Sequence, residues 1–314
     1  MIRISSISQN FHLIVLATSL CVSLSACNTL KQKSTDKDIE RMLSEMKGPE
    51  VASLDSALLD GAKQAEKAGN YSTAVQFYQQ LVEKNPKNSE YQFHLAENMR
   101  RMGAYEESAI QYRKILDDKK FQLDAKEGLG LSQMALGEYD VAGDTLADVM
   151  EADTTRWRTI NAIGILFTIK SMYPEARQYF AEAMVQNPKS ASVRNNLGLM
   201  EALDKNYPEA IRVLQEASNL ARTNNAQRKQ TDLNLALVYA ISGDLDKAQD
   251  SAQPHLNETQ LLNNMGYYAH LADDEILAKS YLNMALTSSD KHYEKAWNNL
   301  ETMNKLTKNA PRRR

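Results

Sequence analysis

The chain holds few of the side chains from which active sites are usually built. Five histidines are present and none has a metal-ligand spacing such as H-E-x-x-H: His12, His94, His255, His270 and His292. There is no G-x-S-x-G nucleophile elbow, no G-x-x-x-x-G-K phosphate loop and no cysteine pair for zinc. Gly128 and Gly130 form a single G-x-G, which close helix packing explains better than a phosphate. We therefore expect no enzyme activity and no metal; an envelope enzyme or enzyme activator is the alternative from a different class.

Cys27 is the residue with the most specific chemistry. A single Arg3 precedes an apolar stretch over residues 11–24, which is too short to span a bilayer comfortably and is typical of a signal-peptide core. The stretch ends in L-S-A-C, which resembles the bacterial lipobox, a leucine three positions before the cysteine that is lipidated. We predict a lipoprotein signal peptide over residues 1–26 and a lipidated Cys27. An ordinary thiol after a cleavable leader is the alternative.

Processing at this site would determine where the protein resides. Cys27 would become the first residue and carry two or three acyl chains, each methylene of which contributes about 0.8 kcal/mol of membrane binding when buried. Asn28 follows, and by the sorting rule for such lipoproteins the absence of Asp at this position favours the outer membrane. Cys21 lies in the leader, so the mature chain would have no free thiol to misfold in an oxidising periplasm. We expect a periplasm-facing protein on the outer membrane, with the covalent lipid as its only added group.

The charge balance argues against nucleic acid as a partner. The formal net charge is −3, and loss of Arg3 with the leader would make it about −4. A surface with nearly balanced charges lacks the basic stripe that binds phosphate backbones.

Asparagines and nearby apolar residues form the candidate binding site. An amide carries both donor and acceptor, so a row of amides can hold the backbone of an extended peptide whatever its sequence. A leucine or tyrosine three positions later would add apolar contact. The candidate peptide-groove residues are Asn195, Asn196, Leu199, Asn234, Leu237, Asn263, Asn264 and Tyr267. The alternative is that these residues are polar only because the surface is solvated.

A repeated helix pair is the element that would position these amides. Tyrosine recurs at a constant spacing of 34 residues, at Tyr71, Tyr105, Tyr139, Tyr173 and Tyr207. This is the period of the tetratricopeptide repeat, in which two antiparallel helices approach closely at small residues. One small column is Ala62, Ala96, Gly130, Gly164, Gly198, Ala236 and Gly266. The other is Ala74, Ser108, Ala142, Ala176, Ala210, Ala248 and Ala278.

Turn residues and two register shifts complete the repeat pattern. Glycine ends four of the predicted first helices, at Gly69, Gly103, Gly137 and Gly243. Pro174 and Pro208 are placed in the opening turn of two second helices, where proline is tolerated. The columns require a four-residue insertion after the fifth repeat and a shortening before the seventh.

These patterns predict an all-α protein, a tetratricopeptide-repeat superhelical solenoid of about seven helix pairs with a carboxy-terminal capping helix. We assign residues 27–54 to the lipidated cysteine and a polar tether, and residues 55–290 to the repeat array. A capping helix over 291–307 would cover the last apolar face, and a disordered basic tail would occupy 308–314.

The repeat geometry predicts which positions face the groove. First helices should line its inner surface, with the residue two before the small column pointing inward. Those positions are Asp60, His94, Gly128, Ala162, Asn196, Asn234 and Asn264. A solvated groove residue is the expected role of His94. Arg100 and Arg101 are placed near the groove edge, and a solvated helix end explains them equally well.

The later repeats resemble a known protein family. The stretches N-N-L-G-L from Asn195, D-L-N-L-A-L-V-Y-A from Asp232 and N-N-M-G-Y from Asn263 are similar to the repeat lipoprotein of the tight-adherence (Tad, or Flp) pilus machinery. The resemblance covers the lipobox and most of the array. It implies an outer-membrane scaffold, pilotin-like, that helps the pilus secretin reach or assemble in the membrane, with the secretin as partner. A type IV pilotin or an adaptor for peptidoglycan enzymes is the alternative. The early repeats, residues 55–122, are long enough to serve a second partner.

Overall fold

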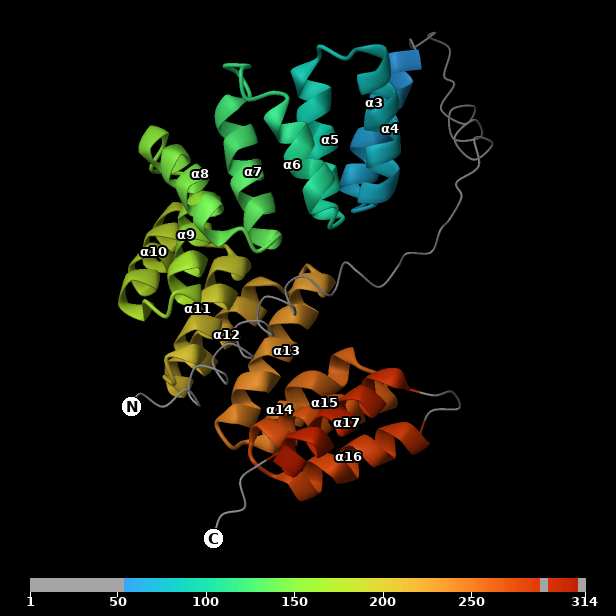
Figure 1. Ribbon diagram of the computed structural model, residues 1–314, viewed down its shortest axis with the longest axis vertical. Coiled ribbons are helices and arrows are strands. Elements are labelled where there is room, and N and C mark those ends of the chain that lie inside the picture. Colours follow the sequence, from blue (N-terminus) through green and yellow to red (C-terminus); the bar gives the residue numbers. More distant parts are fainter. Residues whose placement is uncertain (1–53, 289–292, 310–314) are drawn as a thin grey trace. The chain divides into compact units, whose positions relative to one another are not determined.

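The computed structural model describes residues 54–288 and 293–309, and the regular elements in these ranges are all helical (Figure 1). The chain divides into two compact units between Ser171 and Met172. In the amino-terminal unit the helices are α3 (Leu54–Lys67), α4 (Tyr71–Lys84), α5 (Ser89–Arg101), α6 (Tyr105–Arg113), α7 (Gln122–Ala135), α8 (Tyr139–Ala152) and α9 (Trp157–Ile169).

The carboxy-terminal unit continues the alternation of first and second helices. Its helices are α10 (Tyr173–Gln186), α11 (Ala191–Leu203), α12 (Tyr207–Leu220), α13 (Asn225–Ile241), α14 (Leu245–Ala252), the short 3-10 helix η1 (Gln253–His255), α15 (Glu258–Leu271), α16 (Glu275–Thr287) and α17 (Glu294–Asn309). None of the helices within the described ranges is long and apolar enough to cross a membrane.

The repeat columns explain the helix starts. Each tyrosine of the 34-residue column is the first residue of a second helix, from Tyr71 of α4 to Tyr207 of α12. Pro174 and Pro208 lie in the opening turns of α10 and α12, where a missing backbone N–H costs no hydrogen bond. The predicted positions of these helices are confirmed.

Every residue of both small columns is buried. At Gly130 an added Cβ would lie 2.7 Å from Leu146 Cγ, and at Gly198 it would lie 2.6 Å from Leu214 Cγ. Gly266 and Leu282 repeat the arrangement at 2.7 Å. Glycine at these positions is therefore required by packing between the helices of one pair.

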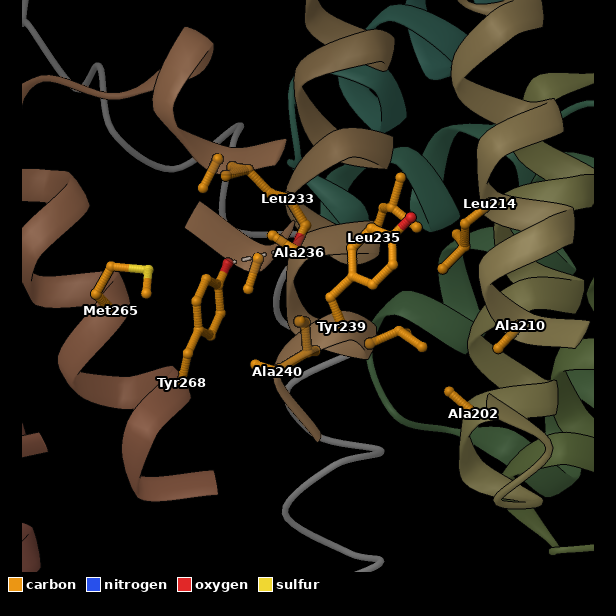
Figure 2. Close-up of a cluster of buried hydrophobic side chains, with 14 residues drawn as sticks. Ala202, Ala210, Leu214, Leu233, Leu235, Ala236, Tyr239, Ala240, Met265 and Tyr268 are labelled. Atoms are coloured by element: carbon orange, nitrogen blue, oxygen red, sulfur yellow. Dashed lines mark hydrogen bonds between the residues drawn. The ribbon is translucent and has the colours of Figure 1, made fainter. Parts of the chain in front are cut away.

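Apolar residues next to the small column complete the core. In the carboxy-terminal unit Leu235 and Ala236 of α13 lie in a cluster with Leu214 of α12 and Met265 of α15 (Figure 2). The hydroxyl of buried Tyr268 donates to the backbone carbonyl of Leu233, 3.3 Å away, which ties α15 to α13 (Figure 2).

The turn between the two helices of a pair has the same backbone conformation throughout. Gly69, Gly103, Gly137 and Gly243 have φ between 72° and 93°. The equivalent positions in the other pairs hold Ser171, Lys205 and Asp273, with φ of 59°, 62° and 60°. The left-handed turn is thus set by the helix pair, and glycine only makes it less costly.

The two register shifts have structural counterparts. The inserted residues extend α13 at its amino end, so that it has 17 residues where α11 has 13. The shortening falls on α14, which has 8 residues and gives way to η1 at Gln253.

The last helix covers the end of the array. Ala296 and Met303 of α17 are buried against Leu282 and Ala285 of α16, in one apolar cluster. Trp297 of the same helix remains about half exposed, at 51%. The all-α fold of seven helix pairs and a terminal helix is therefore confirmed. The predicted signal peptide, Cys27 and the end of the basic tail lie outside the described residues.

Candidate peptide-binding site

Neighbouring first helices of the carboxy-terminal unit contact one another, so their side chains form a continuous face. This amide face consists of residues of α11, α13, α15 and α17, in that order, and α17 extends the row beyond the last pair. All eight predicted groove residues lie on these helices. The face is uncharged at those positions.

Two of the predicted asparagines pair across adjacent repeats. Asn234 Nδ2 of α13 donates to Asn195 Oδ1 of α11 at 2.8 Å, and both side chains are buried, at 1% and 5% exposure. Asn195 Nδ2 in turn donates to Asn196 Oδ1 at 3.5 Å. The bond between Asn234 and Asn195 therefore ties α13 to α11. Of the three amides, only Asn196 is partly exposed.

The same arrangement recurs two repeats later, between α15 and α17. Asn299 Nδ2 of α17 donates to Asn263 Oδ1 of α15 at 3.0 Å, and Asn263 Nδ2 donates to Asn264 Oδ1 at 3.4 Å. Asn263 is buried and Asn264 is partly exposed. The adjacent pairs Asn195-Asn196 and Asn263-Asn264 thus each place a buried amide behind an accessible one.

The predicted groove residues differ in their exposure to solvent. Asn196, Asn264 and Tyr267 reach the surface, whereas Leu199 and Leu237 are buried, at 8% and 5% exposure. Burial raises the pKa of Tyr267 to about 12, so its hydroxyl stays protonated at neutral pH.

One buried acceptor on this face is unpaired. Asn234 Oδ1 has no hydrogen-bond partner among the described residues, although its amide nitrogen is used. An acceptor in this state is stabilised by any donor that reaches it, such as water or a peptide N–H.

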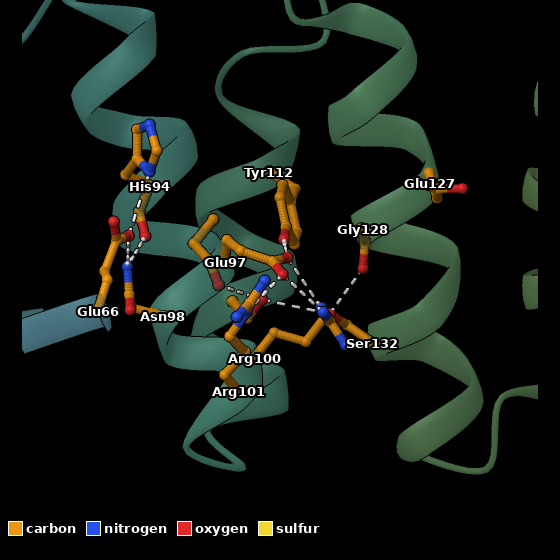
Figure 3. A network of polar contacts seen from close by, with 12 residues as sticks. Glu66, His94, Glu97, Asn98, Arg100, Arg101, Tyr112, Glu127, Gly128 and Ser132 are labelled. Carbon is orange, nitrogen blue, oxygen red and sulfur yellow. Dashed lines mark hydrogen bonds and ion pairs between the residues drawn. The ribbon is translucent and has the colours of Figure 1, made fainter. Parts of the chain in front are cut away.

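The amino-terminal unit holds a different polar cluster, on α3 and α5. Glu66 Oε1 accepts from Asn98 Nδ2 at 2.5 Å and lies 3.2 Å from His94 Nδ1 (Figure 3). The His94 ring also stacks on Tyr78, with centroids 5.1 Å apart. His94 is therefore held by partners on two helices, which the expectation of a solvated groove residue did not include.

Glu97 is the centre of a second cluster. Its carboxylate accepts from Arg100 Nη2 at 2.8 Å, Arg101 Nε at 2.8 Å and the Tyr112 hydroxyl at 2.7 Å (Figure 3). Burial alone would raise the pKa of Glu97, but the guanidiniums of Arg100 and Arg101 outweigh burial and lower it to about 2. Tyr112 reaches Glu97 because Gly128 has no Cβ, which would overlap the tyrosine ring.

The sequence contains one signal for these clusters that lies outside the repeat columns considered above. Tyr78 and Tyr112 are themselves 34 residues apart, and each hydroxyl contacts a first-helix carboxylate, Glu66 at 3.4 Å and Glu97 at 2.7 Å. The other second helices have Leu or Phe at this position in most repeats, which cannot form the bond.

The described residues contain no group of three His, Cys, Asp or Glu side chains arranged to hold a metal ion. Two histidines each lie near one carboxylate instead: His255 Nε2 is 2.6 Å from Asp232 Oδ2, and His270 Nδ1 is 2.7 Å from Glu275 Oε1.

Comparison with known proteins matches part of the array to a family model. A model described as "Tetratricopeptide repeat" matches residues 59–122 and 171–225. A search of the curated proteins gave no match.

Solved structures share the fold at low sequence identity. A tetratricopeptide repeat protein from Parabacteroides merdae is 18% identical with a TM-score of 0.55, over 79% of this chain and 98% of that one. A thermophilic repeat protein from Thermus thermophilus is 16% identical with a TM-score of 0.52, over 58% of this chain and 98% of that one. A chain of the Cut9–Hcn1 hetero-tetramer of APC/C is 15% identical with a TM-score of 0.56, over 94% of this chain and 57% of that one. Residues 59–122 and 171–225 therefore match tetratricopeptide repeats, which generally bind other proteins, and the described helices have the fold of a tetratricopeptide-repeat solenoid.

Proposed function

We propose that this protein is a lipid-anchored scaffold of the outer membrane whose amide face captures an extended segment of a pilus-secretion component. Its partner would be the secretin of the tight-adherence system, and its role would be pilotin-like. The repeats support a function in protein binding. The pilus assignment is supported by the resemblance of the later repeats and of the lipobox.

The observation that carries the proposal is the set of Asn196 on α11 and Asn264 and Tyr267 on α15, the first helices that contact α13 on either side. Each of the two accessible amides is held from behind by a buried one, Asn195 or Asn263. Fixing an amide before binding reduces the entropy lost when a peptide is ordered on it. An uncharged donor and acceptor pair suits a peptide backbone, and the Tyr267 ring adds an apolar contact for one side chain.

The lipid would hold the scaffold at the membrane. A scaffold and its partner that are both held at one membrane meet at a local concentration set by their tethers. Modest affinity at the amide face would then suffice for capture, because the two proteins would meet at the membrane and not in bulk solution.

A pull-down from detergent-solubilised membranes tests the proposal. The full chain should recover the tight-adherence secretin, and a variant with Asn196→Ala, Asn264→Ala and Tyr267→Ala should lose it. Ser280→Ala with Asn283→Ala, two exposed residues of α16, is the control and should bind normally. Asn234 is left unchanged, because it is buried and its replacement would lower stability as well as binding.

Three results would count against it. Recovery of a peptidoglycan enzyme or a type IV secretin would assign the scaffold to another system. Recovery of no secretion component would remove the pilus role. Capture that survives the triple substitution would show that the partner binds elsewhere.

A further inference from the structure

Ile110 departs from the pattern of the second helices. The position two residues after the second small column is not buried in any helix pair. It holds Gln76, Ile110, Asp144, Gln178, Arg212, Asp250 and Ser280. Isoleucine is the one apolar residue in this column, and its exposed fraction is 52%. Since the other six pairs fold with a polar residue here, packing of the helices does not require Ile110.

Ile110 lines an open pocket of about 310 Å³ in the amino-terminal unit. The lining residues are Glu106, Ala109, Ile110 and Arg113 of α6, with Leu136 and Glu138 from the turn between α7 and α8. The helix α6 lies between α5 and α7 (Figure 1). Ala109, Ile110 and Leu136 provide an apolar surface, so an apolar side chain that entered the pocket would be removed from water together with Ile110.

The charged residues of the pocket lie at opposite ends. Glu106 is in the first turn of α6, and Arg113 is its last residue, about 10 Å further along the helix. Glu138 directly precedes α8, and equivalent turns of successive repeats lie at the same end of the array, which places it beside Glu106. Glu107 and Lys114, the next charges along α6 and after it, are exposed and keep the same order. The pocket is therefore acidic at one end and basic at the other.

These charged side chains are open to an external partner. Glu106, Arg113 and Glu138 are all exposed, and no ion pair or side-chain hydrogen bond of theirs is recorded among the described residues. One repeat later the arrangement differs, because Asp140, the equivalent of Glu106, lies 3.3 Å from Lys170. The pocket on α6 thus combines an exposed apolar residue with charges of both signs that the chain itself does not pair.

We propose that this pocket binds an extended segment of a protein partner in which a basic, an apolar and an acidic side chain occupy alternate positions. Alternate side chains of an extended chain point to the same side, and the first and last of the three are about 13 Å apart. The basic side chain pairs with Glu106 and Glu138, and the acidic one pairs with Arg113. The apolar side chain between them covers Ile110. The site lies on a second helix and is separate from the amide face.

The charges favour this segment over simpler ones. A purely apolar segment laid over the pocket would take Glu106, Arg113 and Glu138 out of water without partners, which is unfavourable. A segment with only basic or only acidic residues would meet like charge at one end of the pocket.

Fluorescence anisotropy with labelled peptides tests the proposal on the full chain. The matched peptide has Lys, Leu and Glu at alternate positions between serines. Three control peptides replace the Leu by Ser, the Glu by Lys or the Lys by Glu. The matched peptide should bind about two- to fivefold more tightly than either charge control, as expected for one exposed charge pair. Loss of the leucine should weaken binding about three- to tenfold, because the apolar contact is removed.

Substitutions in the chain locate the site. Ile110→Gln introduces the residue that the first and fourth pairs already have, so the fold should be retained while the matched peptide binds about three- to tenfold more weakly. Ile276→Gln, at an 86% exposed position of α16, makes the same change elsewhere and should leave binding unchanged. Arg113→Glu should reverse the preference, so that the peptide with two lysines binds more tightly than the matched one. Partial unfolding cannot produce such a reversal.

Several results would overturn the proposal. These are equal binding of the four peptides, equal loss in Ile110→Gln and Ile276→Gln, and an unchanged preference in Arg113→Glu. Should the full chain bind none of the peptides but self-associate in sedimentation, and Ile110→Gln not self-associate, the occupant would be a second copy of the chain. The variant with Asn196, Asn264 and Tyr267 replaced should bind the matched peptide normally, so this site and the scaffold function can fail separately.

Discussion

Gly130 and Gly143 lie in adjacent helices of one pair, and the structure predicts opposite results for alanine at the two positions. In Gly130→Ala the new Cβ would lie 2.7 Å from Leu146 Cγ, and Leu146 is fully buried. We expect a loss of about 1–3 kcal/mol in the free energy of unfolding, since the helices must separate. In Gly143→Ala the nearest atom is 3.8 Å away, so the better helix former should be neutral or stabilising by up to about 1 kcal/mol. Urea denaturation measures both, and equal effects would contradict the packing argument.

The turn column gives a second prediction at this scale. Lys205 has φ of 62°, a conformation that costs a residue with a Cβ about 1–2 kcal/mol. Lys205→Gly should therefore raise the unfolding free energy by about 1 kcal/mol, and Gly243→Ala, at φ of 93°, should lower it. Asp273→Gly should gain less, because Asp tolerates this conformation better. A Lys205→Gly variant that is less stable in thermal unfolding would be inconsistent with a left-handed turn.

At the scale of the helix, Glu97 joins α5 to α6 through Tyr112 and should make stability depend on pH. Its pKa in the folded protein, about 2, lies below the ordinary value of 4.5, so the charged form is favoured by folding. The contribution, about 3 kcal/mol, is present above pH 4.5 and is lost as the pH falls toward 2. Glu97→Gln should therefore be less stable than the wild type at pH 7, and the difference should shrink between pH 4.5 and 3. A difference that is constant from pH 7 to 3 would argue against this role.

The terminal helix α17 carries a further prediction. Met303 is 3% exposed against α16, so Met303→Ala should cost about 2–4 kcal/mol locally through the cavity it leaves. Because each repeat contacts only its neighbours, amide exchange should increase in α15–α17 and change little in α11. Thr302→Ala, at an exposed position of the same helix, is the control. Faster exchange throughout the carboxy-terminal unit would indicate a more cooperative array.

The sequence predicted the elements better than the contacts of the site. The small columns and the tyrosine column located the helix pairs, because close approach within a pair is a local requirement repeated every 34 residues. Whether a polar residue is buried or exposed depends instead on the side chains of the next repeat. Asn234 is buried because Asn195, 39 residues earlier, faces it across two helices. Tyr112 reaches Glu97 only because Gly128 lies on another helix, and no pattern within one repeat contains that information.

For the molecule as a whole, the two units differ in the chemistry of their first helices. The amide face of the carboxy-terminal unit is neutral, with Asn196, Asn264 and Tyr267 accessible. The first helix α5 of the amino-terminal unit instead carries a charged cluster, in which Glu97 binds Arg100 and Arg101. Since repeat proteins bind along extended surfaces, a difference of this kind allows one chain to hold two partners at once. Binding to the amide face should be insensitive to salt.

Attachment of the chain to a membrane is predicted from Cys27 alone, which lies outside the described residues. Cys27→Ser removes the thiol that would carry the lipid, so the protein should move from the membrane to the soluble fraction in flotation gradients, and labelled palmitate should mark only the wild type. The repeats should fold in both, since no helix of the described ranges contains a membrane-spanning stretch that could replace the anchor. Secretin recovery should also fall in the variant even with an intact amide face, because the local concentration of the partners is lost. Palmitate on the serine variant would mean that the lipid is attached at another residue, and none on the wild type would mean that the protein reaches its partner without a lipid.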